Sequence, residues 1–238
     1  MTTETDENYL KEIFMLELDH DHATTTLLAD RLGFSAATVT GQLKKLASLS
    51  LVAYSPYRGA TLTEAGRAIA LETIRHHRLL ETYLAQALGV PWDRVHVEAE
   101  RLEHVISEYL EDRIDEMLDH PVVDPHGSPI PSREGTMQEH GQVRLTDLGT
   151  GERAEIIEVN DRDPRLLERL DELGLRLGTR LRVSAIEPLD GLITVEVGNE
   201  RHTLGQTSAR QITVRIEEAV ARRRALGGQK NGQSTRSE

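Results

Sequence analysis

The chain has no cysteine, and aromatic residues make up only 3% of its 238 residues. The lack of cysteine excludes disulfide bonds and thiolate metal sites, and it fits a reducing cytoplasm. No apolar run approaches the roughly 18 residues of a membrane-spanning helix, and the acidic N-terminus lacks the apolar segment of a secretory signal. We therefore expect a cytoplasmic protein without a membrane partner, whose aliphatic core suits helices.

Acidic residues are missing from one stretch of the chain and crowded in another. The formal net charge is −12, which taken alone argues against nucleic-acid binding. However, no acidic residue lies between Asp30 and Glu64, whereas acidic residues crowd residues 72–124. The basic residues of the acid-free stretch are Arg31, Lys44, Lys45 and Arg58. This distribution predicts phosphate contact in the first stretch and cation binding in the second.

The first 70 residues have the pattern of a winged helix-turn-helix. Apolar residues at helical spacing predict helices over residues 7–18, 25–32 and 36–49, and Gly33 lies in the turn between the last two. Two β-prone runs around residues 56–59 then predict a hairpin, the wing. We therefore expect a winged helix-turn-helix DNA-binding domain over residues 1–70.

Two longer helices are expected next, over residues 63–88 and 93–118, followed by a loop rich in Pro and Gly. They predict a helical dimerisation and metal-binding domain over residues 71–131. Homodimerisation is expected because winged-helix proteins read two-fold symmetric operators. An apolar stripe also follows His104, formed by Val105, Tyr109, Ile114 and Leu118.

From residue 141 onward, short alternating strands and one helical segment predict a small β-barrel over residues 141–218. Residues 132–140 are expected to be a linker, and residues 219–238 a disordered basic tail. The predicted fold class is therefore mainly α with a small β-barrel.

The two middle helices carry a stripe of potential metal ligands. On the first, His77 and Glu81 are four residues apart and share a face. On the second, a stripe at i, i+4, i+7 and i+8 is formed by His96, Glu100, Glu103 and His104. Mixed imidazole and carboxylate sets suit Mn, Fe, Co, Ni or Zn. The alternatives are a solvated helical face and a catalytic carboxylate pair, although no nucleophile lies nearby.

The helix expected over residues 36–49 has an exposed face of small, polar or basic side chains, which a major groove accepts without steric or electrostatic penalty. The alternative is an ordinary amphipathic helix in a bundle. Tyr57 and Arg58 at the wing tip could reach phosphate. The predicted DNA-binding residues are Ser35, Ala37, Thr38, Gln42, Lys44, Lys45, Tyr57 and Arg58.

Residues 5–131 contain four distinctive segments, ENYLKEIF, HHRLLETYLAQALG, WDRVHVEAERLEHVISEYLEDRI and DPHGSPIP. These segments resemble the diphtheria-toxin-repressor family of metalloregulators. Residues 141–217, with GLRLGTRL, resemble the SH3-like FeoA-type domain that many members carry. The resemblance implies a homodimeric repressor that binds double-stranded operator DNA when a metal ion activates it, and so controls metal-ion homeostasis.

The resemblance also implies a ligand set. His77, Glu81 and His96 match the ancillary site of iron-type members, and Glu100, Glu103 and His104 match the primary site. Asn8 matches the N-terminal ligand position, Lys11 stands where manganese-type members have Glu, and Asp163 falls near a position at which the SH3-like domain lends a ligand. Oxygen in place of sulfur at Glu100 resembles the manganese-type members, so the implied cofactor is Mn(II) or Fe(II).

Two functions of different classes follow from these patterns. The first is a metal-dependent transcriptional repressor. The second is a metalloenzyme with a Mn/Fe site, which would need an open coordination position beside a substrate cleft. The acid-free stretch has no role in the enzyme hypothesis, so the repressor is favoured.

Overall fold

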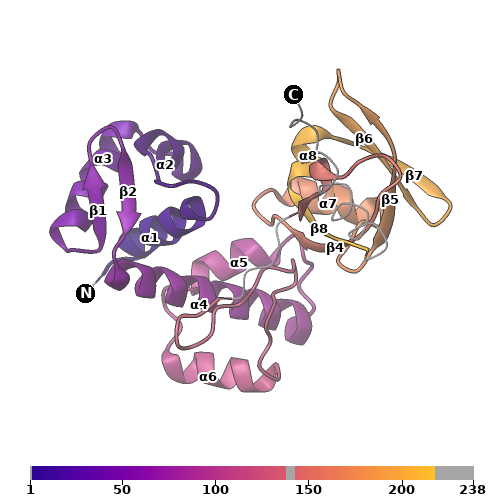
Figure 1. Ribbon diagram of the computed structural model, residues 1–238. Coiled ribbons are helices and arrows are strands. Elements are labelled where there is room, and N and C mark those ends of the chain that lie inside the picture. Colours follow the sequence, from indigo (N-terminus) through magenta and orange to yellow (C-terminus); the bar gives the residue numbers. More distant parts are fainter. Residues whose placement is uncertain (1, 138–142, 218–238) are drawn as a thin grey trace, which may run out of the picture. The chain divides into compact units, whose positions relative to one another are not determined.

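The structure is a computed structural model that describes residues 2–137 and 143–217. The described chain forms two compact units (Figure 1). The first unit holds the chain up to residue 138 except for two short segments, Trp92–Arg94 and Pro125–Ser128, which belong to the second unit. The predicted tail and the end of the predicted linker lie outside the described residues.

The first unit is helical with one hairpin. Its elements are α1 (Glu4–Glu17), α2 (Thr25–Leu32), α3 (Ala36–Ser48), β1 (Val52–Ser55), β2 (Gly59–Leu62), α4 (Glu64–Leu88), α5 (Val95–Leu102) and α6 (Glu108–Met117). Hydroxyl side chains cap most of these helices because they accept the unpaired N–H groups of a first turn. The capping residues are Thr3, Thr24, Ser35, Thr63 and Ser107.

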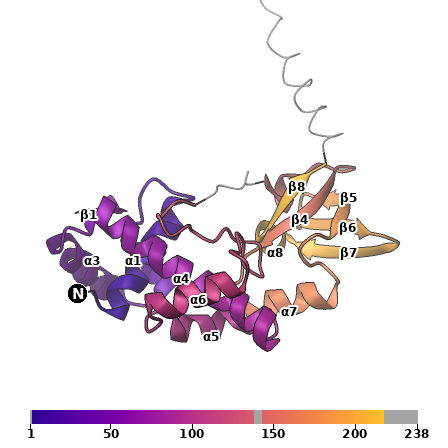
Figure 2. The same ribbon diagram turned by 90° about the horizontal axis from the view of Figure 1, so that it is seen from below.

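Helix α4 is shared by the two apolar cores of this unit. Its first half closes the core of α1, α2, α3 and the hairpin, where Leu10, Leu28 and Leu43 are fully buried. Its second half contributes Leu79 and Leu80 to a core with α5 and α6. Burial of one such side chain contributes about 1.5–3 kcal/mol. Figure 2 shows α4 beside α1, α5 and α6, which it also contacts. It therefore links α1, α2, α3 and the hairpin to the part of the unit that carries the candidate ligands.

The single helix predicted over residues 93–118 is in fact two helices. The chain leaves α5 after Leu102, and α6 begins at Glu108 after its N-cap Ser107, whose hydroxyl accepts a hydrogen bond from the Leu110 N–H. The break places Glu103 and His104 in a turn instead of on a helical stripe. It also splits the predicted apolar stripe, because Ile114 enters the core while Val105 and Tyr109 stay exposed.

The second unit is built on an antiparallel sheet. Its elements are β3 (Val143–Arg144), a 3₁₀ turn (Leu145–Asp147), β4 (Arg153–Val159), α7 (Pro164–Glu172), β5 (Arg180–Glu187), β6 (Leu192–Val197), β7 (Glu200–Gly205), α8 (Gln206–Arg210) and β8 (Ile212–Ile216). The six strands lie in the order β3-β8-β4-β5-β6-β7. The predicted antiparallel strands are therefore present, but no ladder joins β7 to β3 within the described residues, so the sheet does not close into a complete barrel.

None of the described helices is both long and apolar enough to cross a membrane.

The hairpin is anchored to the loop before α2 at one glycine. Gly59 has a φ of +108°, and a Cβ at this position would lie 2.5 Å from the carbonyl oxygen of Ala23. This close approach lets Ala23 and Ala60 exchange two backbone hydrogen bonds of 2.9 Å. Any side chain at position 59 would therefore separate the hairpin from the helices.

We expect Gly59→Ala to lower the free energy of unfolding by about 2 kcal/mol or more, because it adds both strain and a clash. Gly41→Ala is the matched control: Gly41 lies inside α3, and a Cβ there has no atom within 4 Å. The control should be neutral or more stable by up to about 1 kcal/mol. Urea unfolding of both variants measures the difference, and equal stabilities would contradict the prediction.

Candidate metal centre and nucleic-acid interface

Helices α4 and α5 bring three nitrogen and oxygen donors together. His77 Nε2 lies 3.0 Å from Glu81 Oε1 and 3.1 Å from His96 Nδ1, and His96 Nδ1 lies 3.2 Å from Glu81 Oε1. Glu81 is fully buried. Glu100 reaches this group at its edge, because its Oε1 lies 3.5 Å from His96 Nε2 and its side chain is 52% exposed. The four residues predicted from helical spacing therefore do converge.

Glu103 is the centre of a second group. Its Oε2 lies 2.5 Å from His77 Nδ1, so this carboxylate joins the second group to the first. Its Oε1 lies 2.5 Å from Lys11 Nζ and 3.2 Å from His104 Nε2. The Glu103 side chain is only 1% exposed. A buried carboxylate needs a positive partner, and here Lys11 and two imidazoles surround it.

His104 connects this group to the N-terminal helix. Its Nδ1 lies 2.7 Å from Glu7 Oε2, and its Nε2 lies 3.0 Å from Asn8 Oδ1. Asn8 thus lies beside His104, and its predicted part in metal binding stays a prediction. Glu7 was not among the predicted ligands, although its spacing of four from Lys11 on α1 places both on one face.

The carboxylates favour the protonated form of the neighbouring imidazoles. Burial opposes a charge on His77, but Glu81 and Glu103 outweigh it and raise its pKa to about 9. Burial likewise opposes protonation of His104, yet Glu103 and Glu7 raise the pKa of this imidazole. Burial would raise the pKa of Glu103, but hydrogen bonds from His104 and His77 hold it well below its usual range. In this state protons and Lys11 balance the charge of the cluster.

The donor set fits a divalent cation. It comprises imidazole nitrogens, carboxylate oxygens and one amide oxygen, without sulfur, which suits hard-to-borderline ions such as Mn(II) and Fe(II). One ligand atom from each of His77, Glu81 and His96 lies within 4.8 Å of the others. Ligands on one ion at ordinary bond lengths are roughly 3 Å apart, so little movement of these side chains is required.

Asp163 has a separate local role in the second unit. It is the N-cap of α7, and its Oδ1 accepts a hydrogen bond of 3.0 Å from the Arg165 N–H. The same carboxylate pairs with the Arg165 guanidinium at 3.1 Å. Its predicted part in metal binding stays a prediction.

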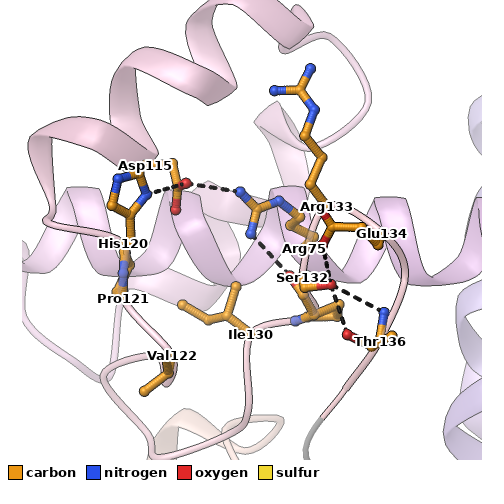
Figure 3. A pocket seen from close by; sticks show the side chains of 11 residues that line it. Arg75, Asp115, His120, Pro121, Val122, Ile130, Ser132, Arg133, Glu134 and Thr136 are labelled. Carbon is orange, nitrogen blue, oxygen red and sulfur yellow. Dashed lines mark hydrogen bonds and ion pairs between the residues drawn. The ribbon is translucent and has the colours of Figure 1, made fainter.

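Next to the donor cluster, Arg75 and His76 form a structural network. Arg75 Nε donates to Glu111 Oε1 at 2.6 Å and its guanidinium also donates to the Pro131 carbonyl at 2.9 Å, while His76 Nε2 lies 3.2 Å from Glu111 Oε2. Figure 3 shows the shallow hollow over Arg75, in which Asp115 lies between Arg75 and His120. Carboxylates and a carbonyl already accept the hydrogen bonds of the Arg75 guanidinium. These contacts around the hollow hold α4 against α6 and the following loop.

The predicted DNA-binding residues fall into two sets. Most are exposed on α3 and at the hairpin tip, and Tyr57 adopts a φ of +69° there. The exposed residues without an ionic partner in the described chain are Ser35, Ala37, Thr38, Lys44, Tyr57 and Arg58. Ser35 caps α3 through the Thr38 N–H. Gln42 and Lys45 form the other set, since both bind Asp6 of α1.

Family models match three consecutive parts of the chain. Residues 1–60 match the iron dependent repressor N-terminal DNA binding domain. Residues 63–132 match the iron dependent repressor metal binding and dimerisation domain, and residues 143–216 match the FeoA domain.

Whole-chain comparisons agree with these matches. The chain is 34% identical over 223 residues to the iron-dependent repressor IdeR of Mycobacterium tuberculosis, covering 89% of this chain and 96% of that protein. It is 33% identical over 190 residues to the diphtheria toxin repressor of Corynebacterium efficiens, covering 76% and 83%. A solved manganese-dependent transcriptional repressor in complex with manganese matches with a TM-score of 0.84 at 38% identity, covering 89% of this chain and 100% of that chain.

Proposed function

This chain belongs to the iron-dependent repressor family of metal-dependent transcriptional regulators, and we propose that Mn(II) or Fe(II) activates it at the cluster formed by α1, α4 and α5. The family consists of homodimeric DNA-binding repressors, so the metalloenzyme hypothesis is set aside. The observation that carries the proposal is the buried contact between Glu103, His77 and His104, with α1 attached to it.

The proposed ligands are the predicted ones of the first unit, with Glu7 added and Asp163 of the second unit left out. His77, Glu81, His96 and Glu100 form one end of the cluster, and Glu103 and His104 form the other, with Asn8 beside them. Glu7 is added because its carboxylate lies 2.7 Å from His104. Lys11 already neutralises one oxygen of Glu103, so this end needs less positive charge from a cation than the His77 end does.

When bound, the metal supplies positive charge and fixed coordination directions. The ligand residues contribute a loss of protons and a link to α1. His77 and His104 lose the protons that the carboxylates hold on them, and Glu7 and Asn8 keep α1 against the turn after α5. This attachment favours the DNA-competent arrangement of the winged segment by population shift.

We also propose that α2, α3 and the β1–β2 hairpin of the first 70 residues form a winged helix-turn-helix, in which α3 is the recognition helix. Support comes from the Gly33 turn between α2 and α3, the Ser35 cap and the exposed polar face of α3. The helical domain would then span residues 71–131, and the SH3-like FeoA-type domain residues 141–218.

Removal of a buried ligand should abolish metal activation. We expect His77→Ala and Glu103→Ala each to weaken Mn(II)-dependent DNA binding by at least about 100-fold, because each removes a donor and leaves buried partners without a counterion. The measurement is fluorescence anisotropy on a duplex that the wild-type protein selects from a random pool in the presence of Mn(II).

His120→Ala is the matched control for this series, because His120 is an exposed imidazole that pairs with Asp115 outside the cluster. It should retain wild-type activation. Wild-type DNA binding that is independent of Mn(II) and Fe(II) would overturn the proposed function.

Metal affinity should fall as the solution becomes more acidic. The pKa of His77 is raised to about 9, so below that pH the metal must displace a proton from this imidazole. Each displaced proton costs about tenfold in apparent affinity per pH unit. Calorimetry at pH 6.5 and 8 in buffers of different ionisation enthalpy should report proton release and weaker binding at the lower pH (roughly tenfold or more over ~1.5 units). An affinity that does not change with pH would contradict this assignment.

The exposed apolar residues around the start of α6 form the proposed dimer surface. Val105 is 75% exposed and Tyr109 is 76% exposed, and Leu102, Leu110 and Met117 are exposed near them in the chain. A second copy of the chain is the proposed occupant, because residues 63–132 match a dimerisation domain. Burial of these side chains would remove apolar area from water.

We expect Val105→Glu and Tyr109→Glu to convert the dimer to a monomer, because each would bury an unpaired charge in the interface. Leu189→Glu is the control, since Leu189 is 99% exposed in the turn between β5 and β6. Size-exclusion chromatography with light scattering measures the masses. Dimers of both α6-region variants at micromolar concentration would show that the surface lies elsewhere.

A further inference from the structure

Asp6 in the first turn of α1 binds the recognition helix. Its side chain is 1% exposed. Its Oδ1 accepts hydrogen bonds of 2.6 Å from Gln42 Nε2 and 2.7 Å from Lys45 Nζ, and its Oδ2 accepts one of 2.9 Å from Lys45. Thr3 completes the site by donating its backbone N–H and its hydroxyl to Oδ2 at 3.0 and 2.9 Å. One carboxylate thus receives five donor contacts.

The next residues of the same helix bind the turn after α5. Glu7 and Asn8 contact His104 at 2.7 and 3.0 Å, and Lys11 contacts Glu103 at 2.5 Å. Consecutive residues of an α-helix point about 100° apart. The first turns of α1 therefore contact α3 through Asp6 and the donor cluster through Glu7 and Asn8.

The contact between Asp6 and α3 restrains the orientation of α3 more strongly than apolar packing does. The buried side of α3 consists of Val39, Leu43 and Leu46, and apolar contacts are non-directional. Charge-assisted hydrogen bonds are directional and stronger than neutral ones. Gln42 and Lys45, three residues apart on one face of α3, therefore determine the rotation and height of this helix relative to α1.

We propose that Asp6 is a positioning residue that transmits the metal-dependent placement of α1 to the recognition helix through Gln42 and Lys45. The proposal rests on the proposed function, because it concerns how the metal and DNA sites are coupled. It gives Gln42 and Lys45 a task inside the protein in place of the base and phosphate contacts expected from the sequence.

A comparison of Lys44 with Lys45 distinguishes a phosphate contact from a contact inside the protein. Lys45 Nζ donates to both oxygens of a buried carboxylate, so its charge is already balanced inside the protein. Lys44 is exposed on the same helix and has no ionic partner within the described residues. Each phosphate contact contributes a slope of about −0.9 to the dependence of log K on log salt concentration. Loss of Lys44 should therefore reduce the slope, whereas loss of Lys45 should not.

The experiment compares wild type, Asp6→Ala, Asp6→Asn, Lys45→Gln, Lys44→Gln and the double variant Asp6→Ala/Lys45→Gln in the full chain. The DNA affinity is measured with and without Mn(II) on the duplex selected by the wild type, and the ratio of the two affinities is the coupling factor. Metal affinity without DNA is measured by calorimetry. The salt slope is measured for each variant with Mn(II) present.

We expect Asp6→Ala and Lys45→Gln each to lower the coupling factor about tenfold while metal affinity changes less than about threefold. The double variant should lose no more than Asp6→Ala alone, because Asp6→Ala already removes the contact that Lys45→Gln breaks. Asp6→Asn, which keeps the shape and the acceptor oxygen, should retain more coupling than Asp6→Ala. The salt slope should fall by about one in Lys44→Gln and stay unchanged in Lys45→Gln.

Three results overturn the inference. A reduced salt slope with full coupling in Lys45→Gln would make Lys45 a phosphate contact, and additive losses in the double variant would show that Asp6 and Lys45 act separately. Thermal unfolding of Asp6→Asn shows whether a lower coupling factor results from misfolding. If wild-type DNA binding does not respond to metal, both the proposed function and the inference fail. If the wild type responds to metal and Asp6→Ala and Lys45→Gln keep its full coupling factor, the inference alone fails.

Discussion

The arrangement of the first unit depends on the charge of one buried carboxylate. Glu103 lies at the turn after α5, with Lys11 of α1 on one oxygen and His77 of α4 on the other. An ionised carboxylate in the interior is costly unless cations and hydrogen bonds compensate it. Its neighbours must therefore supply positive charge, and they come from three elements that are far apart in the sequence. The helices are joined at this point because the charge has to be balanced there.

The same requirement explains why the cluster can respond to a metal ion. Protonated His77 and His104 supply the positive charge in the described state, and both imidazoles have raised pKa values because carboxylates surround them. A proton provides charge but only one bond direction for each nitrogen, whereas a cation binds several ligands at once. Exchange of protons for a metal therefore keeps the charge balanced while it tightens the geometry. Lys11 is the fixed part of this balance, since its ammonium cannot leave the site as an ion can.

How much the sequence predicts depends on how local the determining interaction is. His77 and Glu81 were predicted together because α4 is a regular helix from its Thr63 cap to the Gly89 end. The predicted helix over residues 93–118 failed because apolar periodicity continues through a break made by the Ser107 cap. Glu7 was missed because its partner His104 is 97 residues away. Such a contact leaves no periodic signal in one sequence.

The open sheet of the second unit illustrates the same limit. Alternating strands with turn signals predict an antiparallel sheet, and six strands are present. Whether the edge strands pair depends on strand length and register, and β3 has only two residues. An edge that short offers few donors to β7, so closure is not favoured by backbone hydrogen bonding. The number and direction of strands were therefore predictable from the pattern, but closure was not.

Because the donor cluster lies against α1, the position of α1 decides how far a metal can shift the DNA-binding equilibrium. A metal can shift the DNA-binding equilibrium only by the difference between its affinities for the two arrangements of the protein. Ligands confined to α4 and α5 would bind a cation equally well in both arrangements, because those helices share a core that includes Leu79, Leu80 and Ala99. Glu7 and Asn8 belong to a different element, so their contacts with His104 depend on where α1 lies. The differential affinity must therefore come from the α1 end of the cluster, while the α4–α5 end supplies the bulk of the binding.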